Sequence, residues 1–586
     1  MLKQELIYNN LNKISNDEFK DIIPHKSPIE KLFNINLEKN VKEYKTKFDE
    51  NHFEIKDNKG KDKNVFVKYI TLVDFLKYLT GKYKHENLKI LPGCDEDSIE
   101  NSKYQNYINN KNNYAYVDSF FYYLSGTLKK EKQFLHGIEC YDMFICQKKN
   151  CKINISDDIE YLLDSNYFTK NLGKQFQFED NEANEIFQQN KKEILIIDEE
   201  GDVELTIDTL DCNDMSLCED ISLSISLNSV NELTIDDSEE SDKPSLSLKQ
   251  QLNNNDTINH DEEESDEEES EEEESEEEES EEEESEEEES EEEESEEEES
   301  EEEESEEEES EEEESEEEEE SDYESEEEKM CLLLNEFPTQ VVVIEKCENT
   351  LDKLLDEGDI KVEELESAIF QIITSLYVYQ KKYKFTHNDL HTNNVMYSHT
   401  DKEYFIYKIK DKLYKIPTFG KVYKIIDFGR SIYTYKDEVL CSDSFSKNGT
   451  AHTQYNFKPY YNEKKPVVEP NESFDLCRLA CSIFDFICDD INNINEYRSA
   501  APIYDLIFSW LYDDNGENVL YKSNGDDKYP GFKLYKMISR IVHKHIPEQQ
   551  YNHKSMNKHI ISNIQFELCV KEGKHHYMDI DGIIQP

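Results

Sequence analysis

Apolar side chains recur along this chain in two patterns, one typical of strands and one typical of helices. Residues 64–70 form an apolar run of strand length that includes one lysine, Lys68. Residues 114–130 carry apolar side chains at helical spacing and predict an amphipathic helix. Further along, residues 341–344 predict a second buried strand, and the periodicity over 365–384 predicts a long amphipathic helix.

Other segments carry weaker patterns. Residues 134–147 predict a strand pair or a sheet edge, and residues 422–426 predict a short strand. A helix with one apolar side is predicted to open at Ser473. Residues 1 to about 60 are polar and weakly periodic, so they predict no strong element, whereas the apolar positions in 194–207 hint at short strands. The chain therefore mixes helices and strands.

A tract with no apolar periodicity interrupts these elements. Residues 261–328 contain 54 acidic residues and no basic ones, mostly as a repeated Ser-Glu-Glu-Glu-Glu unit. A five-residue period does not match the helix, and glutamates four residues apart repel each other. With almost nothing apolar to bury, we expect the tract to be disordered and expanded by self-repulsion. It would serve as a tether for basic partners, as an array of serines for acid-directed kinases or, the interpretation we favour, as a solvated linker.

The charge balance limits the partners that the sequence predicts. The formal net charge is -75, and leaving out the acidic tract reduces it to about -21 by the same counting. Specific nucleic-acid binding is not expected, because affinity for a phosphate backbone depends on clustered lysine and arginine. The first residues lack the apolar core of a signal peptide, and no run is long enough to span a bilayer. We therefore expect a soluble intracellular protein that does not bind membranes.

Thirteen cysteines agree with a reducing compartment. None forms a Cys-x-x-Cys pair, and the odd number leaves at least one unpaired. Cys140, Cys146 and Cys151 lie close together in the sequence, and Cys477 and Cys481 lie one helical turn apart, but neither group has zinc-finger spacing. We expect these residues to be free thiols that act as small apolar side chains.

Two short segments after the long helix carry the chemistry. The first reads Thr-His-Asn-Asp-Leu-His-Thr-Asn-Asn and contains Asp389 and, five residues later, Asn394. The second is a short strand that ends in Asp-Phe-Gly, beginning at Asp427. Phosphoryl transfer from ATP requires a carboxylate that accepts the proton of the acceptor hydroxyl, and further oxygen ligands that hold Mg²⁺ against the phosphates. Asp389 fits the first role, and Asn394 with Asp427 fits the second.

These two segments resemble the catalytic loop and the metal-binding motif of the eukaryotic protein kinase superfamily. They are similar to serine/threonine-protein kinases of giant DNA viruses, a likeness that would place the protein in a host cytoplasm or a virion. His391 stands where most protein kinases have lysine, and the haspin branch also has histidine there. The resemblance implies an α+β, two-lobed protein-kinase-like fold, with a small β-rich lobe interrupted by the acidic insertion and a large helical lobe.

The resemblance also assigns roles to single residues. It implies that ATP and magnesium are the cofactors, and that a protein is the substrate. The catalytic set would be Asp389, His391 and Asn394, and the metal ligands would be Asn394 and Asp427. ATP would be bound by Lys68, at its α- and β-phosphates, and by Glu345 and Cys347 at the adenine edge. The supporting set would be His387, Phe428, Gly429, Asp475 and Asp118, the last of these as the helix acid that pairs with the lysine.

Four features depart from the kinase pattern. No Gly-x-Gly-x-x-Gly precedes Lys68, and the first glycine of the chain is Gly60, so the cover over the phosphates is absent or built differently. Asn388 replaces the arginine that pairs with a phosphorylated activation loop, so loop phosphorylation is not an expected switch. The interval between the two motifs is long enough for an extra hairpin at 404–417. The activation segment ends in Val-Glu-Pro at 468–470 instead of Ala-Pro-Glu.

Three functions remain open at this stage. The first is an ATP- and Mg-dependent serine/threonine-protein kinase. The second is a pseudokinase or scaffold that binds basic partners, which the missing glycine loop favours and the retained polar residues oppose. The third is a small-molecule kinase acting on amino alcohols, because His-Asn-Asp-Leu also resembles choline and ethanolamine kinases. Those enzymes usually lack a glycine after their metal-binding pair, whereas Gly429 is present here.

The same resemblance divides the chain into five parts. They are an N-terminal extension (1–63), the first part of the small lobe (64–180), the insertion (181–329), the end of the small lobe with the hinge (330–350) and the large lobe (351–586).

Overall fold

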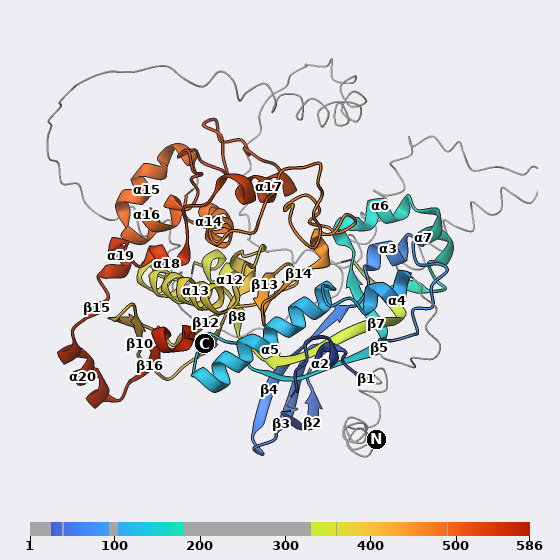
Figure 1. Cartoon of the computed structure of the whole chain (residues 1–586), viewed down its shortest axis with the longest axis horizontal. Coiled ribbons are helices and arrows are strands. Elements are labelled where there is room, and N and C mark those ends of the chain that lie inside the picture. The colour runs from blue at the N-terminus through green and yellow to red at the C-terminus, as the bar shows by residue number, and fades with distance from the viewer. Residues whose placement is uncertain are drawn as a thin grey trace, which may run out of the picture. The chain divides into compact units, whose positions relative to one another are not determined.

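A computed structural model of the chain describes residues 25–37, 40–92, 103–180, 330–358, 360–488 and 490–585 (Figure 1). The predicted strands near 194–207 and the acidic tract 261–328 lie outside these residues. The described part mixes helices with sheets, and strands predominate in its N-terminal half. Among the described residues, no helix is both long enough and apolar enough to cross a bilayer. The cysteines in this part are unbridged and, Cys140 apart, buried.

A seven-stranded sheet forms the N-terminal region. Its order is β1-β5-β7-β4-β3-β2, and β6 pairs with β7. The strands are β1 (His25–Lys26), β2 (Val41–Lys47), β3 (His52–Asp57), β4 (Asp62–Thr71), β5 (Cys140–Asn154), β6 (Phe176–Phe178) and β7 (Cys331–Glu345). The two long strands β5 and β7 pair antiparallel along most of their length, with β7 also pairing with β4. Segments on either side of the insertion thus become neighbours in one sheet.

Alternation along β4 gives the sheet two different faces. Val65 and Val67 pack into a small apolar cluster on one face, whereas Ile70 belongs to the main core on the other. Because side chains in a strand alternate with period two, Lys68 shares the face of Ile70. Helix α5 (Tyr114–Lys132) packs against β5 and β7, and Figure 1 shows it running across the sheet. Asn113 caps its first turn by accepting from the Ala115 N–H.

The C-terminal half is built around two buried helices. Helix α13 (Val362–Tyr383) is buried over most of its surface. Its apolar residues therefore cover more than one face of the helix. Helix α14 (Phe474–Ile487) buries ten of its residues, among them Asp475. The other helices of this half are α12 (Leu351–Asp356), α15 (Ile494–Ala500), α16 (Pro502–Ser509), α17 (Phe532–Ile541), α18 (Pro547–Gln550), α19 (Lys554–Asn557), α20 (Asn563–Glu572) and α21 (Ile580–Ile584).

Three small sheets accompany these helices. The first has the order β12-β9-β8 and joins the two predicted motifs, the second has the order β15-β11-β10-β16, and the third pairs β13 with β14. Their strands are β8 (Asn349–Thr350), β9 (Val395–His399), β10 (Tyr404–Ile409), β11 (Lys412–Pro417), β12 (Lys421–Ile425), β13 (Ile432–Tyr435), β14 (Glu438–Cys441), β15 (Ile560–Ile561) and β16 (His575–Asp579). Short helices α2 (Ile29–Leu32), α3 (Phe75–Leu79), α4 (Lys103–Ile108), α6 (Ile159–Leu163) and α7 (Asn166–Asn171) complete the N-terminal half.

Most predicted elements are present, with shifted ends. The strands predicted at 64–70 and 341–344 are the centres of β4 and β7, and the extra hairpin is β10–β11. Of the two alternatives at 134–147, the strand pair is wrong, because β5 is a single strand; β1 pairs only with Phe144 and Ile145 on its outer side, so most of β5 lies at a sheet edge. The absence of any strong element before residue 60 is also wrong: β2 and β3 pair there and extend the sheet from β4.

Candidate active site

The segment after α13 is held by a buried carboxylate at the start of α14. Asp475 accepts hydrogen bonds from the backbone N–H groups of His387 and Asn388, both at 2.9 Å. All three residues are fully buried, and burial raises the pKa of Asp475 to about 7. Because both carboxylate oxygens accept from backbone donors, Asp475 fixes the course of the loop immediately before Asp389.

Asn388 adds a second anchor to this loop. Its backbone adopts a positive φ of 66°, a conformation that asparagine tolerates better than most residues. The Tyr455 hydroxyl donates to its side-chain oxygen at 2.7 Å, and its amide nitrogen donates to the carbonyl of Arg430 at 2.9 Å. The uncharged Asn388 side chain therefore links the loop to the segment after Asp427 through direct hydrogen bonds.

Asp389 points its carboxylate into a small polar cluster. Its Oδ1 accepts a hydrogen bond from the Tyr535 hydroxyl at 2.9 Å and lies 3.5 Å from the Arg430 guanidinium. The side chain keeps about a quarter of its surface exposed. A carboxylate that is held at one oxygen and partly open to solvent can accept a proton from an incoming hydroxyl.

Asn394 is oriented by its own loop. Its amide nitrogen donates to the backbone carbonyl of Asp389 at 2.8 Å and lies 3.0 Å from Nε2 of His391. Burial lowers the pKa of His391, which keeps the imidazole neutral and able to accept that hydrogen bond. With the nitrogen turned inward, the amide oxygen of Asn394 is the atom left for a cation.

The pairing of β9 with β12 brings the two motifs together. Val395 and Ile425 are cross-strand partners, so Asn394 and the residues after Ile425 meet at the same end of the ladder. The backbone N–H of Ile426 donates to the carbonyl of Asn394 at 2.9 Å. On the other side, Nε2 of His387 donates to the carbonyl of Ile426 at 2.8 Å. The residue before Asp427 is thus bonded to both ends of the loop that contains Asp389.

Lys68 lies between two carboxylates that come from distant parts of the chain. Its Nζ is 3.0 Å from Asp118 on α5 and 2.9 Å from Asp427 after β12. Burial alone would lower the pKa of Lys68, but Asp118 and Asp427 together raise it well above its usual value. The lysine in turn lowers the pKa of Asp427 to about 2, so this carboxylate is ionised at neutral pH.

The two carboxylates differ in their access to solvent. The Asp118 side chain is 1 % exposed and that of Asp427 is 52 % exposed, so Asp427 is the one that a ligand can reach. Burial raises the pKa of Asp118 to about 6, despite the attraction of Lys68. The predicted pairing of Lys68 with a helix aspartate, in place of the usual glutamate, is therefore present as an ion pair in the structure.

Helix α5 also grips the backbone of the Asp-Phe-Gly segment. The N–H of Phe428 donates to Asp118 at 2.6 Å, and the N–H of Asp427 donates to the Tyr122 hydroxyl at 3.0 Å. The Phe428 ring is fully buried and packs edge-on against Tyr122. The N–H of Gly429 donates to the Asp427 carboxylate. Because of these contacts, the orientation of Asp427 depends on the position of α5.

Glu345 and Cys347, the residues predicted at the adenine edge, have structural partners. The Glu345 carboxylate pairs with Lys424 at 2.7 Å and with Lys129, and it accepts from the N–H of Glu139 at 3.1 Å. Burial favours its neutral form, but the two lysines lower the pKa of Glu345 to about 2. Cys347 is buried, with its sulfur 3.8 Å from the Ser398 hydroxyl. Adenine contacts here would have to use the backbone, and they stay a prediction.

The turn between β2 and β3 precedes β4, the strand of Lys68, in a part of the chain that lacks a glycine-rich motif. The Asp49 carboxylate closes this turn by accepting from the N–H groups of Asn51 and His52, both at 2.8 Å. Asn51 then donates from its side chain to the carbonyl of Val67 at 2.8 Å. A turn closed by a carboxylate presents negative charge, unlike a glycine loop, whose free N–H groups attract phosphate.

The donor set of the site fits magnesium. Mg²⁺ binds oxygen ligands, and it is commonly held by one or two carboxylates together with substrate phosphates. Asp427 supplies an ionised, half-exposed carboxylate, and Asn394 supplies an amide oxygen from the adjoining loop. No cluster of three or more His, Cys, Asp or Glu side chains suited to a metal occurs among the described residues. A site with one carboxylate and one amide therefore agrees with a cation delivered by a nucleotide.

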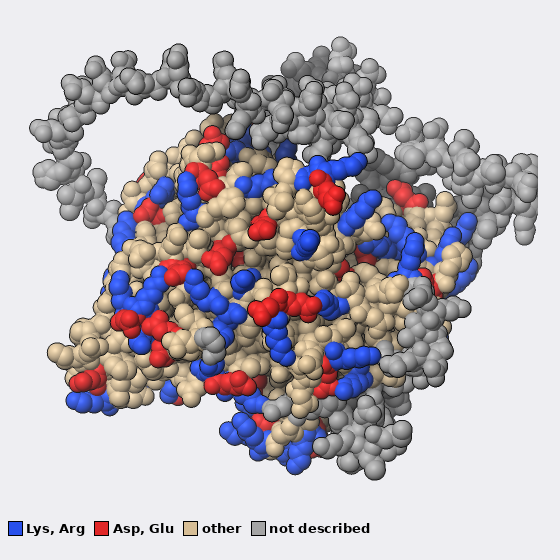
Figure 2. All heavy atoms as spheres, viewed as in Figure 1, with Lys and Arg blue, Asp and Glu red and all other residues tan. Residues whose placement is uncertain are grey.

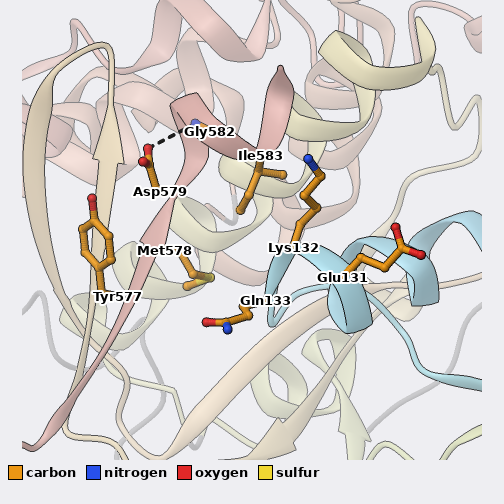
Figure 3. A pocket seen from close by; sticks show the side chains of 8 residues that line it. All are labelled: Glu131, Lys132, Gln133, Tyr577, Met578, Asp579, Gly582 and Ile583. Atoms are coloured by element: carbon orange, nitrogen blue, oxygen red, sulfur yellow. Dashed lines mark hydrogen bonds between the residues drawn. The ribbon is translucent and has the colours of Figure 1, made fainter. Parts of the chain in front are cut away.

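A cavity of about 350 Å³ lies apart from these residues, at the C-terminal end of α5. Its lining comes from that helix end, from β16 and from α21, and includes Lys132 and Asp579. Figure 3 shows Asp579 turned toward the N–H of Gly582, to which it is hydrogen-bonded. Lys132 lies about 20 Å along the helix axis from Asp118, so this cavity takes no part in the chemistry considered above.

Sequence reasoning missed several side chains that shape the site. They are Tyr122, Arg430, Tyr455, Arg478 and Tyr535. Arg430 follows the Asp-Phe-Gly motif directly, so a cation beside that motif was a usable signal. The tyrosines gave none, because the chain contains 36 of them and none belongs to a motif.

Comparison with known proteins gives two partial similarities. One is to a protein of Acanthamoeba polyphaga mimivirus whose name assigns it to the serine/threonine-protein kinases, 43% identical over 101 residues, which is 15% of this chain and 25% of that protein. The other is to a Dictyostelium discoideum protein whose name makes the same assignment, 37% identical over 81 residues, or 12% of this chain and 6% of that protein. The chain thus spans a quarter or less of the curated relatives it matches. No protein-family model matches it.

Proposed function

We propose that this protein is a two-lobed protein-kinase-like enzyme that transfers the γ-phosphoryl group of ATP, with Mg²⁺, to serine or threonine of protein substrates. The observation that carries the proposal is the convergence of Asp389, Asn394 and Asp427 at one end of the β9–β12 pair, with Lys68 bonded to Asp427. The sheet crossed by α5 would be the small lobe, and the region around α13 and α14 the large one. The names of the two partial relatives point to the same class.

Each residue has a defined task in this reaction. Asp389 accepts the proton of the acceptor hydroxyl as the oxygen attacks phosphorus, a role that its partly exposed carboxylate permits. Asn394 and Asp427 would hold Mg²⁺, which when bound neutralises charge on the phosphate oxygens. Lys68 is kept charged by two carboxylates and would contact the α- and β-phosphates. His391 orients Asn394, and Asp475 orients the loop.

A protein acceptor is preferred over an amino alcohol for two reasons. Gly429 follows the metal-binding pair, where amino-alcohol kinases usually lack glycine. Both partial relatives are also named as protein kinases. Nucleic acid is not the expected acceptor, because the formal net charge of the chain is -75 and, over much of the face shown in Figure 2, Lys and Arg lie among Asp and Glu. Basic partners of the acidic tract stay a prediction.

The second candidate is a pseudokinase or scaffold, and one observation favours it. The β2–β3 turn is closed by Asp49, and a carboxylate there would repel the phosphates of ATP if the turn lay over them. Against this, Asp389, Asn394 and Asp427 each keep oxygen atoms suited to catalysis or to a metal, which a scaffold does not require.

Labelled phosphate transfer from ATP by the purified full chain tests the proposal. We expect Mg-dependent labelling of serine or threonine in a general protein acceptor, loss of detectable labelling in Asp427→Ala, and a loss of about a hundredfold to ten-thousandfold in Asp389→Asn. Wild-type rates in both variants would contradict the mechanism. Labelling of amino alcohols in place of protein would support the small-molecule kinase, and ATP binding without transfer would support the pseudokinase.

A further inference from the structure

Tyr535, which no motif contains, makes the most direct side-chain contact to the predicted base. Its hydroxyl donates to Asp389 Oδ1 at 2.9 Å, although 146 residues separate the two in sequence. Tyr535 lies on α17, which packs beside α14, as Figure 1 shows. Helix α14 also carries Asp475, the anchor of the catalytic loop. The base and its loop are therefore held from two neighbouring helices.

Two arginines flank the Tyr535 ring. The guanidinium carbon of Arg478 lies 5.2 Å from the ring centroid and that of Arg430 lies 5.8 Å from it. Burial raises the pKa of Tyr535, the positive charge of Arg478 opposes that rise, and the Tyr535 hydroxyl donates to Asp389. Arg478 stands three residues after Asp475 on α14, so both side chains leave the same side of that helix.

The positive charge beside the base belongs to this cluster. The side chain of His391 is used elsewhere, because its Nε2 lies 3.0 Å from the amide nitrogen of Asn394. The cation nearest to Asp389 is Arg430, at 3.5 Å from Oδ1. Both described contacts of the carboxylate, from Tyr535 and from Arg430, fall on Oδ1. That arrangement leaves Oδ2 for the acceptor hydroxyl.

We propose that Tyr535, supported by Arg478, is a positioning residue that fixes the carboxylate of Asp389 so that Oδ2 faces the acceptor. The inference rests on the proposed function, because it assigns Asp389 as the base. An acceptor tyrosine would also donate to the base, but it would have to enter and leave. Tyr535 is instead stacked on Phe532 at 5.6 Å, and its helix is tied to the activation segment by the Ser539 hydroxyl, which donates to the Gln454 carbonyl at 2.9 Å.

The test is steady-state kinetics of the full chain with Tyr535→Phe, which keeps the ring and removes the hydroxyl. Losing a hydrogen bond to a charged group corresponds to a decrease in kcat of about tenfold to a hundredfold. We expect KM for ATP and Tm to stay at their wild-type values, because the ring packing is preserved. Tyr521→Phe is the matched control, since its hydroxyl donates to Asp485 at 2.8 Å, away from Asp389. It should leave kcat unchanged.

A second arm separates positioning from a general structural effect. If Tyr535 acts through Asp389, adding Tyr535→Phe to Asp389→Asn should cause no further loss. An unchanged kcat in Tyr535→Phe, or an equal loss in the Asp389→Asn background, would overturn the inference. Phosphate found on Tyr535 by mass spectrometry of the wild type would overturn it too, in favour of an acceptor. If Asp389→Asn itself kept full activity, the proposed function would fail first, and the inference with it.

Discussion

The loop that contains Asp389 and the part of the sheet near Glu345 and the β2–β3 turn differ in what their predicted side chains do. On the loop side, Asp389 and Asp427 are partly exposed, and each is held by neighbours at defined distances. In that part of the sheet, Glu345 is tied to Lys424 and Lys129, and the β2–β3 turn is closed by Asp49. The two carboxylates on the loop side are accessible to solvent, whereas Glu345 and Asp49 are engaged in ion pairs or hydrogen bonds within the protein.

The difference shows which part of a kinase-like site a motif predicts well. Under the proposed function, proton transfer and metal binding need particular side chains, so Asp389, Asn394 and Asp427 form a recognisable pattern in the sequence. Contacts to adenine and phosphates can come from backbone N–H and C=O groups, which any residue supplies. We therefore propose that nucleotide contacts at this part of the sheet come from the backbone, while its charged side chains serve stability.

Removing the charge of Glu345 should give the largest change in stability. Lys424 is 2 % exposed, and without Glu345 it faces Lys129 with no anion between them. Breaking a buried ion pair from one side costs about 3 kcal/mol or more. We expect Glu345→Gln to lower the free energy of unfolding by about that amount, measured by denaturant titration, while KM for ATP changes little.

The control removes the second partner as well. Adding Lys424→Met to Glu345→Gln should recover part of the loss, because the more deeply buried of the two lysine charges is removed. Recovery should be incomplete, since Lys129 still lacks its anion and the carbonyls of Leu135 and Gly137 lose their donor. A large rise in KM for ATP with unchanged stability would instead make Glu345 a nucleotide ligand, and the contrast between the two regions would disappear.

A smaller effect is expected from Asp118, at the boundary of the two regions. Its pKa is about 6, and only its ionised form pairs with Lys68. Protonation of Asp118 should therefore lower turnover as the pH drops through about 6, below the separate titration of Asp475 at about 7. Asp118→Asn should lower kcat about tenfold at pH 8 and remove this dependence, since one charge-assisted contact is lost.

Asp443→Asn provides the matched control for that pH profile. Burial raises the pKa of Asp443 to about 6 as well, but this carboxylate accepts from the N–H of Tyr114 and has no contact with Lys68 among the described residues. The fall in turnover near pH 6 should persist in this variant. If Asp443→Asn abolished the fall and Asp118→Asn preserved it, the ion pair of Lys68 would not be its cause.

The smallest effect is expected from the β2–β3 turn. Asp49→Ala removes two backbone hydrogen bonds and the contact with the His52 ring nitrogen from an exposed turn, at a cost of about 1 kcal/mol in the free energy of unfolding. If the turn lies away from the phosphates, KM for ATP should stay at the wild-type value. A marked fall in KM in Asp49→Ala would show that this carboxylate repels the nucleotide, and it would place the turn over the phosphates.

The sequence identified the polar residues that the fold brings together better than the side chains that hold them in place. Asp389, Asn394 and Asp427 were identifiable because their spacing matches a known division of labour, and Asp118 because a helix acid was needed for Lys68. The strand pairing of β9 with β12 then explains how the two motifs meet. Strands β2 and β3 were missed because polar residues alternate with few apolar ones there, and much of their stability comes from pairing with β4.

Long-range side-chain contacts could not be predicted. Tyr535 reaches Asp389 from a helix 146 residues away, and nothing in its local sequence distinguishes it from other half-buried tyrosines. Tyr122 and Tyr455 are similar cases, since each hydroxyl finds its partner only after α5 and the activation segment are packed. Such contacts depend on tertiary distance, which periodicity and motifs do not encode.

The most direct test is calorimetric titration of the full chain with ATP, with and without Mg²⁺, in the wild type, Asp427→Ala and Asp389→Asn. If Asp427 and Asn394 share a nucleotide-bound cation, Mg²⁺ should strengthen ATP binding in the wild type and in Asp389→Asn, and should fail to do so in Asp427→Ala. Equal strengthening by Mg²⁺ in all three proteins would contradict the account.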